Sequence, residues 1–290
     1  MMRIEPKNWQ VMRLASNLSR ILVAIDGSEH SDYALNVSVK IGEKFSSAMD
    51  LVHVELPSSG AGPEPSIKKA EYVLDDRVGM VKERKLICNP IKIQSSDPAD
   101  EILKLVNSGS YDLAVLGSRG HGELKSLVLG SVSSKVAKES KRSVLVVKSR
   151  IEAVPKILLG YDGSEQGNKA LELASDLGLK FNAQVDAACV FNVPLSPEAY
   201  IGAEVDRWEK DMRNMLESAV AKLKASGVRS QGKILDHTNV ALALANEAEK
   251  GSYDIIVVGS RGQGRLKSLL LGSVAYGVAN SSKNNVLIVR

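Results

Sequence analysis

The sequence has few aromatic residues, which make up 4% of its 290 positions. Phe, Tyr and Trp therefore cannot build its hydrophobic cores, although 44% of the residues are hydrophobic. Val, Ile, Leu and Ala must do so, and dense runs of these residues are typical of parallel sheets covered by helices on both faces. The composition favours an α/β fold, and the length suggests two domains of ordinary size.

Cysteine is scarce, and long apolar runs and a large excess of basic charge are missing. The two cysteines, Cys88 and Cys189, are too few for a disulfide framework, so we expect reduced thiols in a cytoplasmic protein. No apolar run reaches the length of a membrane span, and no signal-peptide core follows the start. The formal net charge is only +4, without a basic stripe that carries interleaved aromatics. We therefore expect neither a membrane nor a nucleic acid as partner.

What the sequence does contain is one glycine-rich stretch, twice. Each copy follows a short apolar run, 113–116 or 255–258, and precedes a run of small apolar residues. Both copies have the spacing G-x2-G-x9-G-S, formed by Gly117, Gly120, Gly130 and Ser131 in the first and by Gly259, Gly262, Gly272 and Ser273 in the second. The pattern predicts a strand, a loop and a helix, which together aim unpaired N–H groups and the positive end of a helix at one point. That arrangement suits a phosphate group.

Two better-known phosphate motifs do not fit this stretch. The G-x4-G spacing of a P-loop is present, but Glu123 and Arg265 stand where that motif needs lysine. A dinucleotide fingerprint fails because Lys125 occupies the place of its third glycine. A single such loop could equally be a tight turn without a ligand, but its repetition in the same context favours a ligand.

The duplication extends beyond the glycine-rich stretch. Residues 20–28, which end in Asp26, Gly27 and Ser28, are echoed by residues 156–164, which end in Asp162, Gly163 and Ser164. Two copies of one domain follow, over 20–148 and 156–290, with a linker at 149–155. Residues 1–19 form an N-terminal extension that either covers an edge or frays in solvent.

Strands and helices are expected to alternate in both copies. In the first copy we expect strands at 21–25, 50–54, 91–94, 112–117 and 143–148, and helices at 29–45, 67–87 and 98–108 and after the glycine loop. In the second we expect strands at 156–161, 184–190, 231–235, 254–259 and 285–290, and helices at 165–180, 198–226, 239–250 and 268–281. Asp97 followed by Pro98 is a strong helix start.

One helix has an especially regular apolar stripe. In helix 198–226 the stripe consists of Val205, Trp208, Met212, Met215, Ala219 and Leu223. The helical period favours core packing for these side chains over a binding surface. The alternating elements predict parallel sheets wound on both sides through right-handed crossovers.

In an open parallel sheet, ligands bind beyond the carboxyl ends of the strands. Asp26 and Asp162 end the first strand of each copy, and the glycine loops end the fourth. A carboxylate repels phosphate, so these aspartates fit a ribose hydroxyl or a base edge. The competing interpretation is that Asp26 simply caps the next helix, with Ser28 as a rival cap.

These residues resemble the universal stress protein family. The strand end Val-Ala-Ile-Asp-Gly-Ser, the pair His53-Val54 and the spacing G-x2-G-x9-G-S carry the resemblance, which spans Arg20 to Arg290 as a tandem pair. It implies two doubly wound domains, each with a five-stranded parallel sheet like that of adenine nucleotide α-hydrolases, and membership of the ATP-binding branch. The implied ligand is ATP, AMP or ADP, with or without Mg²⁺. The implied binding residues are Asp26, Gly27, Ser28, Val54, Gly117, Arg119, Gly120, Gly130, Ser131, Ser133, Asp162, Gly163, Ser164, Val190, Gly259, Arg261, Gly262, Gly272 and Ser273.

The second copy departs from the pattern at two places. Ala275 replaces Ser133, and Val240 replaces Pro98, which the resemblance puts near the base. We therefore expect a weaker second site.

Catalytic residues are harder to find. His121 and His53 are candidate bases, but Gln263 and Cys189 replace them in the second copy, and no nucleophile is paired with a base. Arg119 and Arg261 either stabilise phosphate charge or are exposed loop charges.

These residues favour an ATP-binding stress-response regulator, with an unidentified protein partner and at most slow hydrolysis. The alternatives are an adenylating or nucleotidyl-transfer enzyme of related fold, and a pseudo-dimer that binds no nucleotide.

The terminal strands of both copies are apolar and nearly identical, over 144–148 and 286–290. An apolar edge left open invites uncontrolled pairing with other chains. We expect the two edges to pair antiparallel within one chain and to make one continuous sheet, an intramolecular pseudo-dimer that can associate further into a homodimer.

Overall fold

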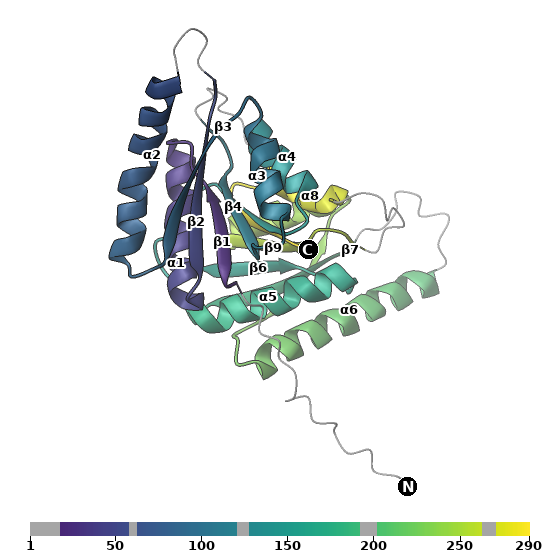
Figure 1. Cartoon of the computed structure of the whole chain (residues 1–290). Coiled ribbons are helices and arrows are strands. Elements are labelled where there is room, and N and C mark those ends of the chain that lie inside the picture. Colours follow the sequence, from purple (N-terminus) through teal and green to yellow (C-terminus); the bar gives the residue numbers. More distant parts are fainter. Residues whose placement is uncertain (1–17, 58–62, 121–127, 192–201, 263–270) are drawn as a thin grey trace.

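The computed structural model describes residues 18–57, 63–120, 128–191, 202–262 and 271–290 (Figure 1). The expected extension at 1–19 therefore lies almost wholly outside the described residues, as does His121. Ten strands and eight helices alternate along the described chain.

The first half contains β1 to β5 and α1 to α4. In chain order these are β1 (Arg20–Ala24), α1 (Glu29–Phe45), β2 (Ala48–Glu55), α2 (Pro63–Glu83), β3 (Cys88–Gln94), α3 (Pro98–Asn107), β4 (Leu113–Gly117), α4 (Ser131–Glu139) and β5 (Ser143–Val147). The second half repeats this order with β6 (Lys156–Gly160), α5 (Glu165–Phe181), β7 (Gln184–Phe191), α6 (Gly202–Ala225), β8 (Gly232–Asp236), α7 (Val240–Lys250), β9 (Ile255–Gly259), α8 (Ser273–Ser281) and β10 (Asn285–Val289).

All ten strands lie in one sheet, in the order β3-β2-β1-β4-β5-β10-β9-β6-β7-β8. Within each half every pairing is parallel. The two halves join where β10 pairs antiparallel with β5, and Leu287 lies directly opposite Leu145. The expected continuous sheet is confirmed.

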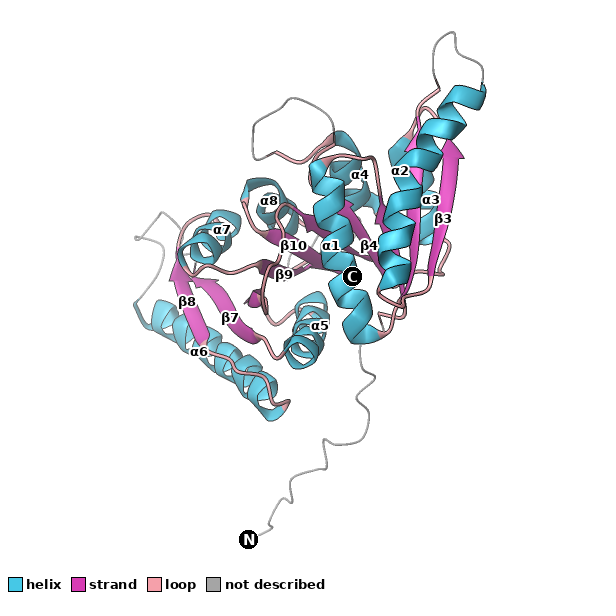
Figure 2. Cartoon of the chain, turned by 90° about the vertical axis from the view of Figure 1, so that its left-hand side faces the viewer, coloured by secondary structure: helices cyan, strands magenta, loops and turns pink. Residues whose placement is uncertain are grey.

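Helices cover both faces of the sheet (Figures 1 and 2). One apolar layer packs α1, α2, α5 and α6 against the sheet, and the other packs α3, α4, α7 and α8. Both layers consist largely of Val, Ile, Leu and Ala from both halves. The fold thus follows the aliphatic composition, with the two halves sharing both layers.

Helix starts follow the local sequence closely. Asp97 accepts a hydrogen bond from the Asp100 N–H at 3.0 Å, with Pro98 at the first helical position, as expected. Asn239 caps α7 in the same way, at 3.1 Å from the Leu242 N–H. Polar side chains at these positions satisfy N–H groups that have no partner inside the helix.

Two boundaries differ from the expectation for identifiable reasons. Strand β3 begins at Cys88 and contains Pro90, because β3 is an edge strand and proline needs no ladder partner there. Helix α2 begins at Pro63 rather than at residue 67, since proline is compatible with the first turn of a helix.

Helix α6 corrects a further expectation. Ala219 and Leu223 are buried in the core and Met212 and Met215 pack against it, as the stripe predicted. Trp208, however, is 45% exposed, and the two methionines also line a cavity. The physical reason is length: 24 residues of helix reach about 36 Å, whereas the eight residues of β7 reach about 26 Å. The first turns of α6 therefore extend past the end of the strand. The side chain of Val205 lies outside the described part of the chain.

The junction between the halves is reinforced by reciprocal contacts. The Lys44 ammonium lies over the Phe181 ring at 6.0 Å, and that of Lys180 lies over the Phe45 ring at 5.7 Å. These residues lie at the ends of α1 and α5, so the two cation–π contacts are related by the same pseudo-twofold axis as β5 and β10.

A double-mutant cycle tests the strand junction. Leu145→Ala and Leu287→Ala should each lower the free energy of unfolding by about 2–5 kcal/mol, because both side chains are fully buried. The two changes should be non-additive by about 0.5–3 kcal/mol, because the residues face each other across the junction. Urea denaturation of the two single mutants and the double mutant measures this term. The control is the pair Leu145→Ala and Leu223→Ala, whose residues are far apart and whose effects should add. If the effects of Leu145→Ala and Leu287→Ala also simply add, the two residues do not pair at the junction.

Candidate functional site

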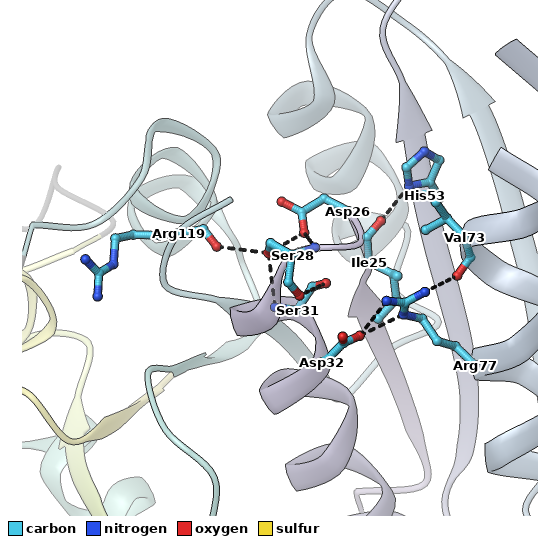
Figure 3. A network of polar contacts seen from close by, with 9 residues as sticks. All are labelled: Ile25, Asp26, Ser28, Ser31, Asp32, His53, Val73, Arg77 and Arg119. Atoms are coloured by element: carbon cyan, nitrogen blue, oxygen red, sulfur yellow. Dashed lines mark hydrogen bonds and ion pairs between the residues drawn. The ribbon is translucent and has the colours of Figure 1, made fainter. Parts of the chain in front are cut away.

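The first candidate site begins where β1 ends, at Asp26, Gly27 and Ser28 (Figure 3). Gly27 has a φ of 85°, which favours glycine. Asp26 Oδ1 accepts hydrogen bonds from the Ser28 N–H at 2.9 Å and from its hydroxyl at 2.5 Å. Ser28 is the residue that caps α1, through its Oγ and the Ser31 N–H at 3.3 Å. Asp26 is therefore not the helix cap, and its exposed carboxylate lies at the carboxyl edge of the sheet.

The second half repeats this turn at Asp162, Gly163 and Ser164. Gly163 has a φ of 75°, and Asp162 Oδ1 accepts from the Ser164 N–H at 3.0 Å. Ser164 caps α5 through the Gly167 N–H at 3.0 Å. The same local sequence thus gives the same turn.

Each glycine loop meets the aspartate of its own half. A Cβ built on Gly120 would lie 2.5 Å from Asp26 Oδ2, and one built on Gly262 would lie 2.5 Å from Asp162 Oδ2. A larger residue at either position would push the carboxylate aside, because the close atom is the end of the aspartate side chain. The expected convergence of the ends of the first and fourth strands is therefore present in both halves.

Gly117 and Gly259 serve helix packing. A Cβ on Gly117 would lie 2.6 Å from the His30 carbonyl carbon, and one on Gly259 would lie 2.7 Å from that of Gln166. The clash is with backbone at the first turns of α1 and α5, which cannot move aside easily. Gly117 lets the first turn of α1 pack directly against the end of β4, and Gly259 does the same for α5 and β9.

Gly130 and Gly272 precede helices whose first turns lack side-chain caps. Each is the N-cap residue of its helix, α4 or α8, and makes no side-chain hydrogen bond there. Each glycine N–H instead donates to a loop carbonyl, that of Ser118 at 2.8 Å or of Ser260 at 2.7 Å. Ser131 and Ser273 are exposed at these helix starts. An uncapped N-terminus that faces solvent can take an anion.

Ser133 faces inward. It is 3% exposed, and its hydroxyl donates to the carbonyls of Ser118 at 2.8 Å and Gly130 at 3.1 Å. The resemblance assigns this hydroxyl to the phosphates, whereas in the structure it braces the two ends of the glycine loop. Ala275 replaces it in the second half, so that loop lacks this brace.

The arginines of the two loops contribute their backbone to the site. The Arg119 carbonyl accepts from Ser28 Oγ at 3.3 Å, and the Arg261 carbonyl from Ser164 Oγ at 3.4 Å. The Arg119 guanidinium extends away from Asp26 (Figure 3). Its Nη2 lies 3.3 Å from His30 Nε2. The pKa of His30 is lowered by burial and then by the Arg119 charge.

The candidate bases outside the glycine loops are occupied. His53 is buried, and its Nδ1 lies 2.7 Å from the Ile25 carbonyl and its Nε2 2.9 Å from Glu55 Oε2. Cys189 replaces it in the second half and donates to the Tyr161 carbonyl at 3.0 Å. Burial, and secondarily Asp162, raises the pKa of the Cys189 thiol to about 12. His121 and Gln263 lie outside the described residues.

The second half contains a cavity of about 690 Å³. The apolar side chains of its lining, which we call the apolar wall, come from β7, α6, α7, β9 and α8. Asp162, Asp211 and the glycine loop also line the cavity. The lining comprises Gly160, Tyr161, Asp162, Ala188, Cys189, Val190, Asp211, Met212, Met215, Val240, Leu244, Val258, Gly259, Ser260, Arg261, Gly262, Gly272, Ser273, Val274 and Ala275. Of the expected second-half residues, only Gly163 and Ser164 are not part of this lining.

Met212, Met215 and Leu244 line the cavity, which the sequence did not predict. Their apolar periodicity resembles that of a core stripe, because one wall of the cavity is itself apolar. The excess length of α6 over β7 could have identified the two methionines. In the first half Val54 lies in β2, paired with Ile93, at the place where Val190 lines the cavity.

None of the helices in the described residues is long and apolar enough to cross a membrane. Within the same residues, no three His, Cys, Asp or Glu side chains are grouped to hold a metal ion.

Comparison with known proteins gives consistent matches across the chain. The sequence profile described as the universal stress protein family matches residues 17–148 and again 154–290. A universal stress protein of Mycolicibacterium smegmatis is 26% identical over 287 residues, covering 93% of this chain and 96% of the relative. One of Mycobacterium tuberculosis is 25% identical over 296 residues, with the same coverage. The crystal structure of a universal stress protein from Archaeoglobus fulgidus superposes with a TM-score of 0.71 at 25% identity, covering 95% of this chain and 97% of that one.

The glycines of the loop should differ in what they contribute to stability. Gly117→Ala should lower the free energy of unfolding by about 1–3 kcal/mol, because its Cβ meets the backbone of α1. Gly130→Ser should leave the fold as stable or slightly more stable, because its nearest neighbour would lie 3.4 Å from the Cβ and serine is a good N-cap. Urea denaturation of both variants measures the difference. Equal losses would show that Gly117 is not a packing glycine.

Proposed function

The chain belongs to the universal stress protein family, and we propose that it is a nucleotide-dependent stress-response regulator that binds an adenine nucleotide in each half. The observation that carries this proposal is the second-half cavity, whose lining combines an apolar wall, the Asp162 carboxylate and a glycine loop. Such a lining offers a partner to each of the three parts of a nucleotide: base, ribose and phosphates.

The base end would lie against the apolar wall. Val190, Met212, Met215 and Val240 offer flat or adaptable apolar surface for a purine ring. The edge of that ring can hydrogen-bond to backbone, the role that the family resemblance gives to Val190 and to Val54.

The ribose would lie against the aspartate. Asp162 Oδ1 accepts a hydrogen bond from the Ser164 N–H within its own turn. Its Oδ2 faces Gly262 at the cavity. Carboxylates hold ribose hydroxyls in other nucleotide folds. We propose the same role for Asp26 in the first half.

The phosphates would lie at the glycine loop and the helix start. Gly262, Gly272 and Ser273 line the cavity beside the uncapped N-terminus of α8, where backbone N–H groups and the helix dipole favour an anion. Arg261 lines the same region and can neutralise phosphate charge. In the first half the proposed residues are Gly120, Gly130, Ser131 and Arg119. Gly27 and Ser28, and Gly163 and Ser164, shape the turns that carry the aspartates.

A regulator is favoured over an enzyme. Among the described residues around the two glycine loops, His53 has both ring nitrogens engaged, and the Cys189 thiol stays protonated at neutral pH because its pKa is raised to about 12. Neither is available as a general base or nucleophile, so we expect at most slow ATP hydrolysis. The alternative is an adenylating or nucleotidyl-transfer enzyme, which would release AMP or pyrophosphate in the presence of an acceptor.

We further propose that the two halves are separate domains at 20–148 and 156–290, joined by residues 149–155. A cytoplasmic location is part of the same proposal, because Cys88 and Cys189 are both free and buried.

Nucleotide binding can be tested through the start of α4. ATP should bind the unmodified protein in calorimetry, with or without Mg²⁺. In an Asp162→Ala background, which leaves the first site, Gly130→Asp should weaken binding about tenfold or more, because a cap carboxylate would occupy the N–H groups and repel phosphate. Gly130→Asn is the matched control, because it caps the helix without the charge and should retain more affinity.

The proposal fails if the unmodified protein has no measurable affinity for ATP. The enzyme alternative gains support instead if AMP or pyrophosphate accumulates during incubation with ATP and a candidate acceptor.

The first site should bind ATP more tightly than the second. The Ser133 hydroxyl braces the first glycine loop, and a neutral hydrogen bond of this kind contributes about 0.5–1.5 kcal/mol, or roughly twofold to twelvefold in affinity. Calorimetry of Asp162→Ala and Asp26→Ala proteins compares the two sites. Ser133→Ala should weaken the first site, and Ala275→Ser should strengthen the second. Equal affinities in the two aspartate variants would contradict the expected asymmetry.

A further inference from the structure

Two cations cross the junction between the halves. Lys148 follows β5 directly, and its ammonium donates to the carbonyl of Ser282, the C-cap residue that follows α8. Arg290 follows β10, and its Nη2 donates to the Ala137 carbonyl at 2.6 Å, in the last turn of α4. Each half therefore supplies the cation at the C-terminal end of a helix that belongs to the other half.

These two helices are the ones that start at the candidate phosphate sites. Each has nine residues and so spans about 13 Å, from the uncapped N-terminus at the site to the carbonyls that the crossing cation contacts. A positive charge at the C-terminal end of a helix interacts favourably with the helix dipole and fixes the last turn. Lys148 thus holds the far end of the second-site helix, and Arg290 that of the first-site helix.

The same cations lie next to the glycine loop of their own half. The Ser118 N–H donates to the Val147 carbonyl at 2.7 Å, and the Ser260 N–H to the Val289 carbonyl at 2.7 Å. Lys148 and Arg290 are the next residues along these strands. Their charges interact with the loop arginines: burial and then Arg119 lower the pKa of Lys148 to about 8, and burial and then Arg261 lower that of Arg290 to about 10.

The backbone beside each cation is also held from the opposite half. Asn285 Oδ1 accepts from the N–H groups of Lys148 at 2.8 Å and Ser149 at 3.1 Å. The Arg290 N–H donates to Ser143 Oγ at 3.3 Å. Neither cation can therefore shift without disturbing the start of a central strand in the other half.

We propose that Lys148 and Arg290 are positioning residues that couple the two phosphate sites, each by linking the glycine loop of its own half to the helix of the other site. An anion held beside Arg119 offsets the repulsion between Arg119 and Lys148, which strengthens the contact of Lys148 with Ser282 and holds α8 in place for a second anion. The reverse path runs from Arg261 through Arg290 to α4. The inference rests on the proposed function, because it needs an anion at each loop, and it predicts positive cooperativity between the sites.

The crossed arrangement makes the test specific. In the full-length Asp26→Ala protein, which leaves the second site, Lys148→Met should weaken ATP binding about fivefold or more, although Lys148 belongs to the first half. In the Asp162→Ala protein, Arg290→Met should weaken the first site similarly. Lys148→Arg should restore second-site affinity. Lys40→Met is the matched control, because Lys40 also contacts carbonyls near the junction, those of Ile151 and Glu152, but neither α4 nor α8.

A second probe keeps the test independent of ATP recognition and of global stability. Inorganic pyrophosphate needs only the loop and the helix start, and the amide NMR signals of Ser131 and Ser273 report the two sites separately in the full-length chain. Lys148→Gln, which keeps a donor for Ser282 without the charge, should reduce the response at Ser273, at temperatures where the thermal unfolding curve shows the variant folded.

Second-site affinity that changes less than twofold in Lys148→Met, or first-site affinity that does so in Arg290→Met, would overturn the coupling while leaving the proposed function intact. A protein that binds neither ATP nor pyrophosphate would overturn both.

Discussion

The rest of the structure depends on the antiparallel pairing of β5 with β10. Val144, Val146, Val286 and Ile288 are completely buried at this junction, where each half alone would present an apolar strand edge. Pairing the two edges within one chain leaves β3 and β8 as the outer strands of the sheet. β3 carries Pro90 and Lys92 and β8 carries Lys233, residues that discourage further pairing at an exposed edge. Closing the centre of the sheet in this way also lets both helical layers continue across the two halves.

The direction of that pairing decides where the two candidate sites lie. All strands are parallel within a half, and the two halves run antiparallel to each other. The carboxyl ends of the first-half strands and those of the second-half strands therefore point in opposite directions. The two sites therefore face away from each other. The C-terminal ends of α4 and α8 consequently lie beside the opposite site, where Arg290 and Lys148 meet them. If β5 and β10 were parallel, both sites would lie at the same end of the strands. The contacts of Arg290 with α4 and of Lys148 with the end of α8 would then be lost.

The two halves differ at several positions around the candidate sites and in the helices that flank them. The Asp-Gly-Ser turn and the loop glycines are the same in both, whereas His53 is replaced by Cys189, Pro98 by Val240 and Ser133 by Ala275. In the first half Lys135 of α4 contacts Asp97 and Asp100 at 3.0 and 2.6 Å. In the second half Gly277 takes the place of that lysine, and a Cβ there would lie 2.7 Å from Ala241. One pair of helices is thus bridged by charges and the other is in direct contact, which gives the two sites different surroundings on the same frame.

The sequence by itself determined the α/β class, the duplication, most boundaries of the elements and the local turns. Apolar periodicity, the Asp97-Pro98 helix start and the Asp-Gly-Ser turns depend on residues a few positions apart, so the local sequence contains the information. Only the tertiary structure decided that Gly117 packs against the backbone of His30, that Ser133 braces a loop, and that Met212 and Met215 face a cavity. The physical reason is that what a glycine faces, where a hydroxyl donates and which part of a helix passes the end of its strand are set by elements far away in the chain. An apolar cavity wall and an apolar core also produce the same periodicity, so the apolar periodicity alone could not separate them.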